Sequence, residues 1–247
     1  MIGGGLAGAT LANALVRELH LEIHVFESAS EFSERGAAVG LGINAQLALN
    51  QVLPTATALL GRAGAVPLNS SRTILGSGPE AGKLIFDLAE SDPGKVVHRA
   101  SLLLVKLALD QSDPSRYSQW EHKSTPTYAK QHVCLVGDAA HATTPWQGSG
   151  TGLAIEDAMV LGALLAEISS SKDIESAFRA YDEVRRPRCQ QVIDSSRETG
   201  RIFCGQSGLQ ADKLRGLLAP RWDFIFGLDM EAHKQDALAK MREIQMK

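Results

Sequence analysis

Three glycines near the start of the chain have the spacing of a phosphate-binding turn. Gly3, Gly5 and Gly8 match G-x-G-x-x-G, and the leucines from Leu6 to Leu19 lie at helical spacing. Glycines in such a turn let backbone N–H groups approach a pyrophosphate at a helix N-terminus, where the helix dipole favours negative charge. The pattern therefore predicts a loop that binds a dinucleotide pyrophosphate.

An acidic residue follows at the distance that a dinucleotide site requires. Glu27 ends the β-prone stretch LEIHVFE and lies 19 positions after Gly8. A carboxylate at the tip of the second strand accepts hydrogen bonds from ribose hydroxyls. We expect Glu27 to bind the adenosine ribose. The alternative is a surface acid that closes a strand.

A second group of chemically suggestive residues lies in CLVGDAAHATTPWQGSGTGLAIEDA. The apolar run HVCLV predicts a buried strand that delivers Asp138 to a loop. Pro145 stiffens the following turn, and Gly148 and Gly150 lead into an apolar helix predicted from Thr151 to Glu167. This arrangement builds a second helix N-terminus, which would stabilise negative charge on a bound ring.

The other elements needed to position these residues can be placed coarsely. Strands are expected at 21–27 and within 61–95, and the Gly/Ala-rich SERGAAVGLGIN is expected to be a loop. Helices are expected over 45–60, 99–109, 173–201 and the C-terminal residues after 214. Pro187 is expected to kink or break the helix that contains it.

Composition excludes several classes of protein. The 247 residues are 44% apolar and 21% charged, with a net charge of −3, which is typical of a soluble globular protein without a nucleic-acid partner. The densest basic cluster, Arg185–Arg188, is expected to form a solvated helix face. Cys134, Cys189 and Cys204 lack a C-x-x-C spacing, which argues against a disulfide framework or a zinc site.

The same composition bears on location. No basic region followed by an apolar run indicates a secretory signal, and the longest apolar stretch, AMVLGALLAEI, is too short to span a bilayer. We therefore expect a cytoplasmic protein without a transmembrane segment.

Four blocks of the sequence resemble one enzyme family. GGGLAGATLANAL with VFE, GAAVGLGINA, VHRASLL and VGDAAHATTPWQGSGTGLAIEDA resemble the FAD-dependent aromatic hydroxylases, most closely their salicylate-hydroxylase-like branch. The resemblance implies an α/β fold with a Rossmann-like FAD-binding domain of the p-hydroxybenzoate-hydroxylase type. It also implies bound FAD, NADH or NADPH as co-substrate, and hydroxylation of a phenolic or related aromatic molecule with O2.

The resemblance assigns roles to individual residues. Gly40 would lie beside the flavin and ribityl chain, and Arg99 would reach the pyrophosphate, although a surface helix cap is the alternative for Arg99. Asp138 would bind ribityl or ribose hydroxyls, and Gly150 and Thr151 would present N–H groups to the pyrimidine end of the flavin. The implied division is a first FAD-binding segment (1–109), a residual linker (110–131), a second FAD-binding segment (132–170) and a C-terminal helical region (171–247).

Three aromatic residues near these blocks have competing interpretations. His141 is expected to be a packed residue that orders its loop rather than a catalytic base. Trp146 faces either the substrate cavity or the flavin loop, and the sequence does not favour either. Trp222 is expected to serve in packing.

The sequence also departs from the family pattern. Asp138 follows Arg99 by only 39 positions, no Asp-Gly dipeptide occurs, and only Met1 and Ile2 precede the glycine turn. The polar residues 110–131 have too little apolar surface to form a substrate domain. We therefore expect the first strand and the middle segment to be missing, and we assign no catalytic residue. A non-catalytic remnant of the fold is the main alternative. A flavin-dependent halogenase or reductase is another, although no Trp-x-Trp-x-Ile motif is present.

Overall fold

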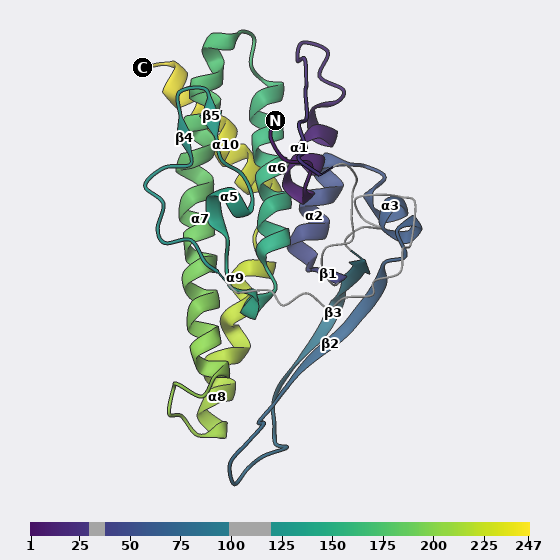
Figure 1. Cartoon of the computed structure of the whole chain (residues 1–247), viewed down its shortest axis with the longest axis vertical. Helices are drawn as coiled ribbons and strands as arrows, with labels where there is room; N and C mark the ends of the chain where they lie inside the picture. The colour runs from purple at the N-terminus through teal and green to yellow at the C-terminus, as the bar shows by residue number, and fades with distance from the viewer. Residues whose placement is uncertain (30–37, 99–119) are drawn as a thin grey trace.

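The computed structural model describes residues 1–29, 38–98 and 120–247 of the chain (Figure 1). Its α-helices are α1 (Leu6–Leu15), α2 (Ile43–Val52), α3 (Ala56–Arg62), α5 (Asp138–His141), α6 (Gly150–Ala166), α7 (Ile174–Phe203), α8 (Ala211–Leu218), α9 (Asp223–Phe226) and α10 (Met230–Gln245). Its strands are β1 (Ala38–Leu41), β2 (Val66–Ile74), β3 (Leu84–His98), β4 (Ala129–Lys130) and β5 (Val133–Cys134).

Helix α6 lies at the centre of the fold. It packs against α1 and α2 on one side and against α7 and α10 on the other (Figure 1). From Gly152 to Leu164 every residue except Ala163 is buried. A helix that is buried all round must be apolar on every face, and only Glu156 and Asp157 break this rule here. The long apolar run identified in the sequence is therefore the core of the protein.

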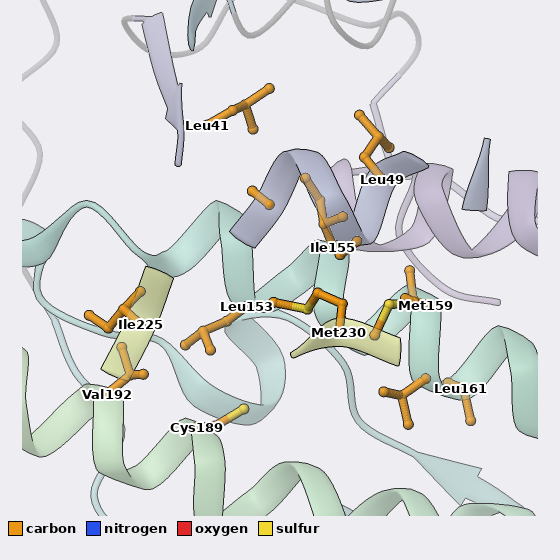
Figure 2. Close-up of a cluster of buried hydrophobic side chains, with 14 of the residues drawn as sticks. Leu41, Leu49, Leu153, Ile155, Met159, Leu161, Cys189, Val192, Ile225 and Met230 are labelled. Carbon is orange, nitrogen blue, oxygen red and sulfur yellow. The ribbon is translucent and has the colours of Figure 1, made fainter. Parts of the chain in front are cut away.

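Apolar side chains from several helices meet around α6. Figure 2 shows Leu153 and Met159 of α6 together with Met230, which starts α10, and with Cys189 and Val192 of α7. All five are at most 3% exposed. Their burial joins the C-terminal helices and the earlier part of the chain into one hydrophobic core.

The main sheet is antiparallel and has the strand order β1-β3-β2. Ala38 of β1 pairs with His98, and Val66 of β2 pairs with Val96, so one end of β3 lies between both neighbours. The other end of β3 forms a long hairpin with β2 (Figure 1), and β3 contacts α8 along this part. This hairpin contains the two β-prone pieces that were predicted within 61–95.

The predicted strand at 21–27 does not form. In the described residues it makes one isolated parallel bridge, between Ile2 and Phe26. A strand needs a neighbouring strand that pairs with it over several residues, and among the described residues only Met1–Gly3 pairs with this segment. The strand prediction for 21–27 was therefore wrong, although its residues are β-prone.

Two further strand predictions were wrong. Residues 38–41, which were assigned to a glycine-rich loop, form β1 because they pair with β3. HVCLV was expected to be a buried strand, but β5 spans only Val133–Cys134 and Val133 is 65% exposed. Among the described residues its partner is β4, so it lies in a two-stranded hairpin at the surface.

The helix predictions hold better. The helix predicted over 151–167 is α6, displaced by one residue, and the C-terminal residues are helical as expected. Helix α7 continues through Pro187, because its packing against α6 and α10 outweighs the missing N–H. The helix predicted over 45–60 is divided into α2 and α3 at Pro54. The helix predicted over 99–109 lies outside the described residues. No described helix has the length and apolar character needed to cross a membrane.

Candidate functional site

The N-termini of α1, α2 and α6 lie near one another. A Cβ placed on Gly137 would lie 2.9 Å from Ala7 of α1 and 3.7 Å from Ala154 of α6, so the Gly-Asp turn sits where these helices touch. A Cβ placed on Gly152 of α6 would lie 3.0 Å from Asn44, the second residue of α2. The fold therefore brings together the loops of the three sequence blocks that precede α1, α2 and α6.

The glycine turn before α1 has the geometry of an anion site. Gly3 has a φ of +99°, and a Cβ on Gly8 would lie only 2.0 Å from the carbonyl oxygen of Gly3. Only glycine fits at both positions. Within the described residues, the N–H groups of Leu6, Ala7 and Gly8 have no hydrogen-bond acceptor, because the first helical bond runs from Ala9 to Gly5. This helix end can therefore bind an anionic group.

Glu27 lies beside the same turn. Its Oε2 accepts a hydrogen bond from the Gly4 N–H at 2.7 Å, and its Oε1 accepts one from the Ala29 N–H at 2.9 Å. The bond from Ala29 and, to a smaller extent, the bond from Gly4 hold the pKa of Glu27 below its usual range. The side chain is an exposed carboxylate that fixes the turn, and it is available at the edge of the site for polar groups of a ligand.

Asp138 follows a strained turn. Gly137 has a φ of +61°, and its N–H donates to Asp157 Oδ2 at 2.9 Å. Asp138 is the first residue of the short helix α5, and its side chain is exposed. The turn therefore leaves Asp138 exposed, next to Gly137, which packs close to Ala7 of α1.

The N-terminus of α6 also lacks a cap. Pro145 starts a short 3-10 turn, Gly148 has a φ of +63°, and Ser149 is the N-cap residue without a side-chain cap bond. The first helical bond is donated by Leu153, so in the described part of the chain the N–H groups of Gly150 and Thr151 have no acceptor. This end therefore has donors free for an anionic group, and the binding role of Gly150 and Thr151 stays a prediction.

The structure provides less information on two other predicted site residues, Gly40 and Arg99. Gly40 lies in β1, two residues before the Gly42 N-cap of α2, and its exposed position is at the sheet edge nearest α2. Arg99 lies outside the described residues. Its assignment to the pyrophosphate therefore stays a prediction.

The aromatic residues have packing roles. His141 and Trp222 are buried, and Trp222 contacts the ring of Phe86. Trp146 packs edge-on against Phe203, and a Cβ on Gly200 would lie 2.3 Å from the Trp146 indole nitrogen. Trp146 therefore fastens the turn before α6 to α7.

The interpretation of Arg185–Arg188 as a solvated face was wrong. Arg185 is 0% exposed and Arg188 is 8% exposed. Arg185 forms ion pairs with Glu156 at 2.8 Å and with Asp157 at 2.9 Å, both of which are fully buried. The signal was present in the sequence. Two carboxylates inside an apolar helix need a counter-charge, and a neighbouring amphipathic helix carries one.

The buried network is ionised. Burial alone would raise the pKa of Asp157, but His141 and Arg185 hold it well below its usual range. Arg185 and Arg188 likewise outweigh burial and lower the pKa of Glu156. Burial would lower the pKa of His141, yet the adjacent Asp157 raises it to about 11. His141 is therefore a buried residue paired with Asp157, as expected of a histidine that orders its loop.

One cluster in this network has the composition of a metal site. The ligand atoms of His141, Asp157 and Cys189 lie within 4.8 Å of one another. Arg185 donates to both Asp157 and Cys189, the latter at 3.6 Å. The guanidinium therefore supplies the positive charge that a metal ion would bring. The three cysteines are free thiols.

Comparison with known proteins connects this geometry to flavoenzymes. Residues 93–196 match the family described as "FAD binding domain". The chain is 37% identical over 134 residues to 6-methylsalicylate 1-monooxygenase of Aspergillus terreus, which covers 53% of this chain and 30% of the relative. It is 32% identical over 167 residues to an FAD-dependent monooxygenase of Gibberella moniliformis, covering 63% and 37%. A salicylate hydroxylase of Pseudomonas putida is 33% identical over 132 residues, covering 52% and 30%.

Solved structures show the same fold. A salicylate hydroxylase in a substrate complex superimposes with a TM-score of 0.76 at 16% identity, and the alignment covers 96% of each chain. CtdE in complex with FAD and a substrate gives 0.73 at 12% identity, covering 100% of this chain and 98% of that one. At these identities the match establishes the fold alone.

These matches confirm two predictions, the resemblance to FAD-dependent aromatic hydroxylases and the fold class. The matched segments span about a third of the length of the curated relatives (30–37%). In the described residues, the parallel sheet of the Rossmann-like fold is represented by the Ile2–Phe26 bridge.

Proposed function

We propose that this chain binds FAD between the N-termini of α1, α2 and α6, as a component of an FAD-dependent monooxygenase that hydroxylates a phenolic acid. The observation that carries the proposal is the convergence of uncapped helix ends, two of which present unpaired backbone N–H groups among the described residues. FAD carries negative charge in its pyrophosphate and develops it on the reduced ring, so it needs donors at two separate positions.

The residues present fit this cofactor. Gly8 lets the Gly3 carbonyl pack against the first turn of α1, and this close turn leaves the N–H groups at the start of α1 open to a pyrophosphate. Glu27 would bind the adenosine ribose beside it, and exposed Asp138 would bind the ribityl hydroxyls. Gly150 and Thr151 would bind the pyrimidine end of the ring.

Each residue has a limited task in the reaction. The chemistry that bound FAD would supply is the reaction of the reduced flavin with O2, after reduction by NADH or NADPH. The N-terminus of α6 stabilises negative charge on the bound ring, and the Trp146 turn holds that helix end against α7. Glu27 and Asp138 orient the nucleotide and ribityl moieties of the cofactor.

The substrate class follows from the relatives. Two of them are named for salicylate and 6-methylsalicylate, which are aromatic acids with a phenolic hydroxyl. We therefore propose a hydroxybenzoate-like substrate.

FAD titration of the purified chain tests the binding proposal. Binding should quench flavin fluorescence with saturation at one FAD per chain. Gly8→Val should abolish this change, because its side chain would collide with the Gly3 carbonyl and displace the glycine turn from the start of α1, whereas Gly61→Ala in α3 should not alter it. Absence of saturable binding by the wild-type chain would overturn the proposal.

A turnover assay tests the activity. NADH or NADPH oxidation should increase when salicylate or 6-methylsalicylate is added, and hydroxylated product should accumulate in proportion. The short spacing between Arg99 and Asp138 supports one competing function, a flavin-binding protein without turnover. FAD binding together with background oxidation for every phenol would establish that alternative.

We also propose a cytoplasmic location. Three free thiols, with no disulfide among the described residues, support a reducing compartment. Imaging of a fluorescent fusion in the source cells would test this, and a signal confined to an oxidising compartment would exclude it.

A further inference from the structure

We propose that Arg185 is a positioning residue of the flavin site, acting through two buried carboxylates that hold two different loops of that site. The proposal rests on the proposed function for its ligand. Arg185 lies on α7, outside the blocks that would touch FAD. Its side chain is 0% exposed and extends into the contact between α6 and α7.

The first branch runs to the start of α2. Arg185 Nη1 donates to Glu156 Oε2 at 2.8 Å, and Glu156 Oε1 accepts from Asn44 Nδ2 at 2.9 Å. Asn44 is 3% exposed and fills the space between Gly42 and Gly152. This branch therefore sets the distance between the N-termini of α2 and α6.

The second branch runs to the Asp138 turn. Arg185 Nε donates to Asp157 Oδ1 at 2.9 Å, and Asp157 Oδ2 accepts from the Gly137 N–H at 2.9 Å and from His141. The residue between Gly137 and His141 that would meet the cofactor is Asp138. This branch therefore fixes the backbone from which Asp138 projects.

One guanidinium serves both branches because its N–H groups point in fixed, different directions. Glu156 and Asp157 are adjacent in the chain, so their carboxylates leave α6 in different directions, and a compact ammonium could approach only one of them closely. Arg188 does not replace Arg185. Its Nε and Nη2 contact Glu156 only at 3.5 and 3.4 Å, Nη1 donates to the Phe224 carbonyl at 2.9 Å, and Nη2 also donates to the Ile225 carbonyl.

The ends of the two branches distinguish positioning from simple support of the core. Arg185 also contacts the Leu153 carbonyl at 3.2 Å and His233 Nε2 at 3.0 Å within the core. The two branches through the carboxylates, however, each end at a loop of the site. Buried hydrogen bonds that orient binding groups commonly change ligand affinity when they are removed, even though they do not touch the ligand. FAD affinity should therefore depend on a residue of the C-terminal helices.

Two variants separate the branches. Arg185→Lys retains the charge but loses the simultaneous contacts, and Asn44→Ala removes the α2 branch while every buried charge keeps its partner. The matched control is Arg186→Lys, the adjacent position on α7, whose ion pair with Asp182 is partly exposed and leads to residues 127–128. Three quantities are measured for each protein: the FAD dissociation constant, the melting temperature of the apoprotein, and backbone hydrogen exchange without FAD.

Arg185→Lys should raise the FAD dissociation constant by roughly ten- to a hundredfold. It should also accelerate exchange in both 42–46 and 137–141 of the apoprotein. Asn44→Ala should weaken FAD binding roughly tenfold and accelerate exchange in 42–46 alone. Arg186→Lys should change none of these quantities.

Other outcomes decide against the proposal. Wild-type affinity and unchanged exchange in a folded Arg185→Lys protein would overturn it, as would an equal effect of Arg186→Lys. If Arg185→Lys fails to fold, Asn44→Ala decides through the same measurements. If the wild-type chain does not bind FAD, the proposed function fails. The exchange pattern then still decides whether Arg185 positions the two loops.

Discussion

The two walls of the candidate site are built in opposite ways. Helix α6 is buried on every face, and its two carboxylates are neutralised by α7. The paired backbone segments on either side of α1, residues 1–3 and 24–27, instead leave Ile2 96% exposed and Phe26 64% exposed. Backbone hydrogen bonds, such as that from Gly3 N to Phe26 O at 2.7 Å, hold these segments together.

This difference separates the source of stability from the source of binding. The α6 wall has its geometry before any ligand arrives, because apolar packing and buried ion pairs fix it. The glycine turn has few buried contacts, so its local free energy of opening is expected to be small. A ligand that binds there stabilises the turn by mass action.

Replacement of Arg185 in the buried α6 wall should cause the largest loss in the free energy of unfolding. Arg185→Met would leave Glu156 and Asp157 buried with reduced compensation, and the free energy of unfolding should fall by about 3–5 kcal/mol. Urea denaturation measures this value. Arg186→Met, which breaks a partly exposed pair on the same helix, should cost less than ~1 kcal/mol. Equal losses would mean that burial of the network does not matter.

A methyl group added to the contact between α1 and α6 should cause the next largest loss in the free energy of unfolding. A Cβ on Gly162 would lie 2.7 Å from the Cβ of Ala14, so Gly162→Ala should destabilise the protein by about 1–3 kcal/mol. The matched control is Gly61→Ala in α3, where no heavy atom lies within 4 Å. This control should be neutral or stabilising by up to ~1 kcal/mol. A neutral Gly162→Ala protein would show that the two helices can separate easily.

Acid should lower the free energy of unfolding through His233, which lies on α10 and contacts Arg185 of α7. Burial, followed by the neighbouring Arg185, lowers the pKa of His233 from 6.5 to about 4. The unfolded chain therefore binds this proton more readily, and the stability contributed by neutral His233 is lost as the pH falls from 6.5 towards 4. We expect a loss of up to ~2 kcal/mol, which His233→Gln should remove. Parallel pH profiles for the two proteins would contradict this assignment.

The smallest change in the free energy of unfolding is expected at Ile2, in the exposed segment before α1. Ile2→Thr should change the free energy of unfolding by no more than ~0.5 kcal/mol, because the side chain is almost fully accessible. Thermal denaturation of the apoprotein provides the measurement. A loss above ~1 kcal/mol would show that this segment belongs to the packed core.

Local signals explain which features could be predicted from the sequence. The apolar run and its preceding Gly148-Ser149-Gly150 turn placed α6 to within one residue. The glycine turn was also recognisable, because its steric requirement is local. The strand at 21–27 was not predictable in the same way, since a strand depends on partners elsewhere in the chain.

The buried arginines illustrate a different limit. RRPR is polar, and a polar cluster on an amphipathic helix is usually solvated. Only the pairing of α6 with α7 shows that Arg185 faces inwards. The carboxylates of Glu156 and Asp157 were the available clue, but the sequence alone does not specify which basic residue meets them.

The guanidinium of Arg185 also determines how the protein comes apart. If α7 detached first, two ionised carboxylates would remain inside an apolar helix without a counter-charge, which is a state of very high free energy. Partial unfolding along that route is therefore suppressed. Helices α2, α6 and α7 should melt as one cooperative unit, and the calorimetric and van't Hoff enthalpies of that transition should agree.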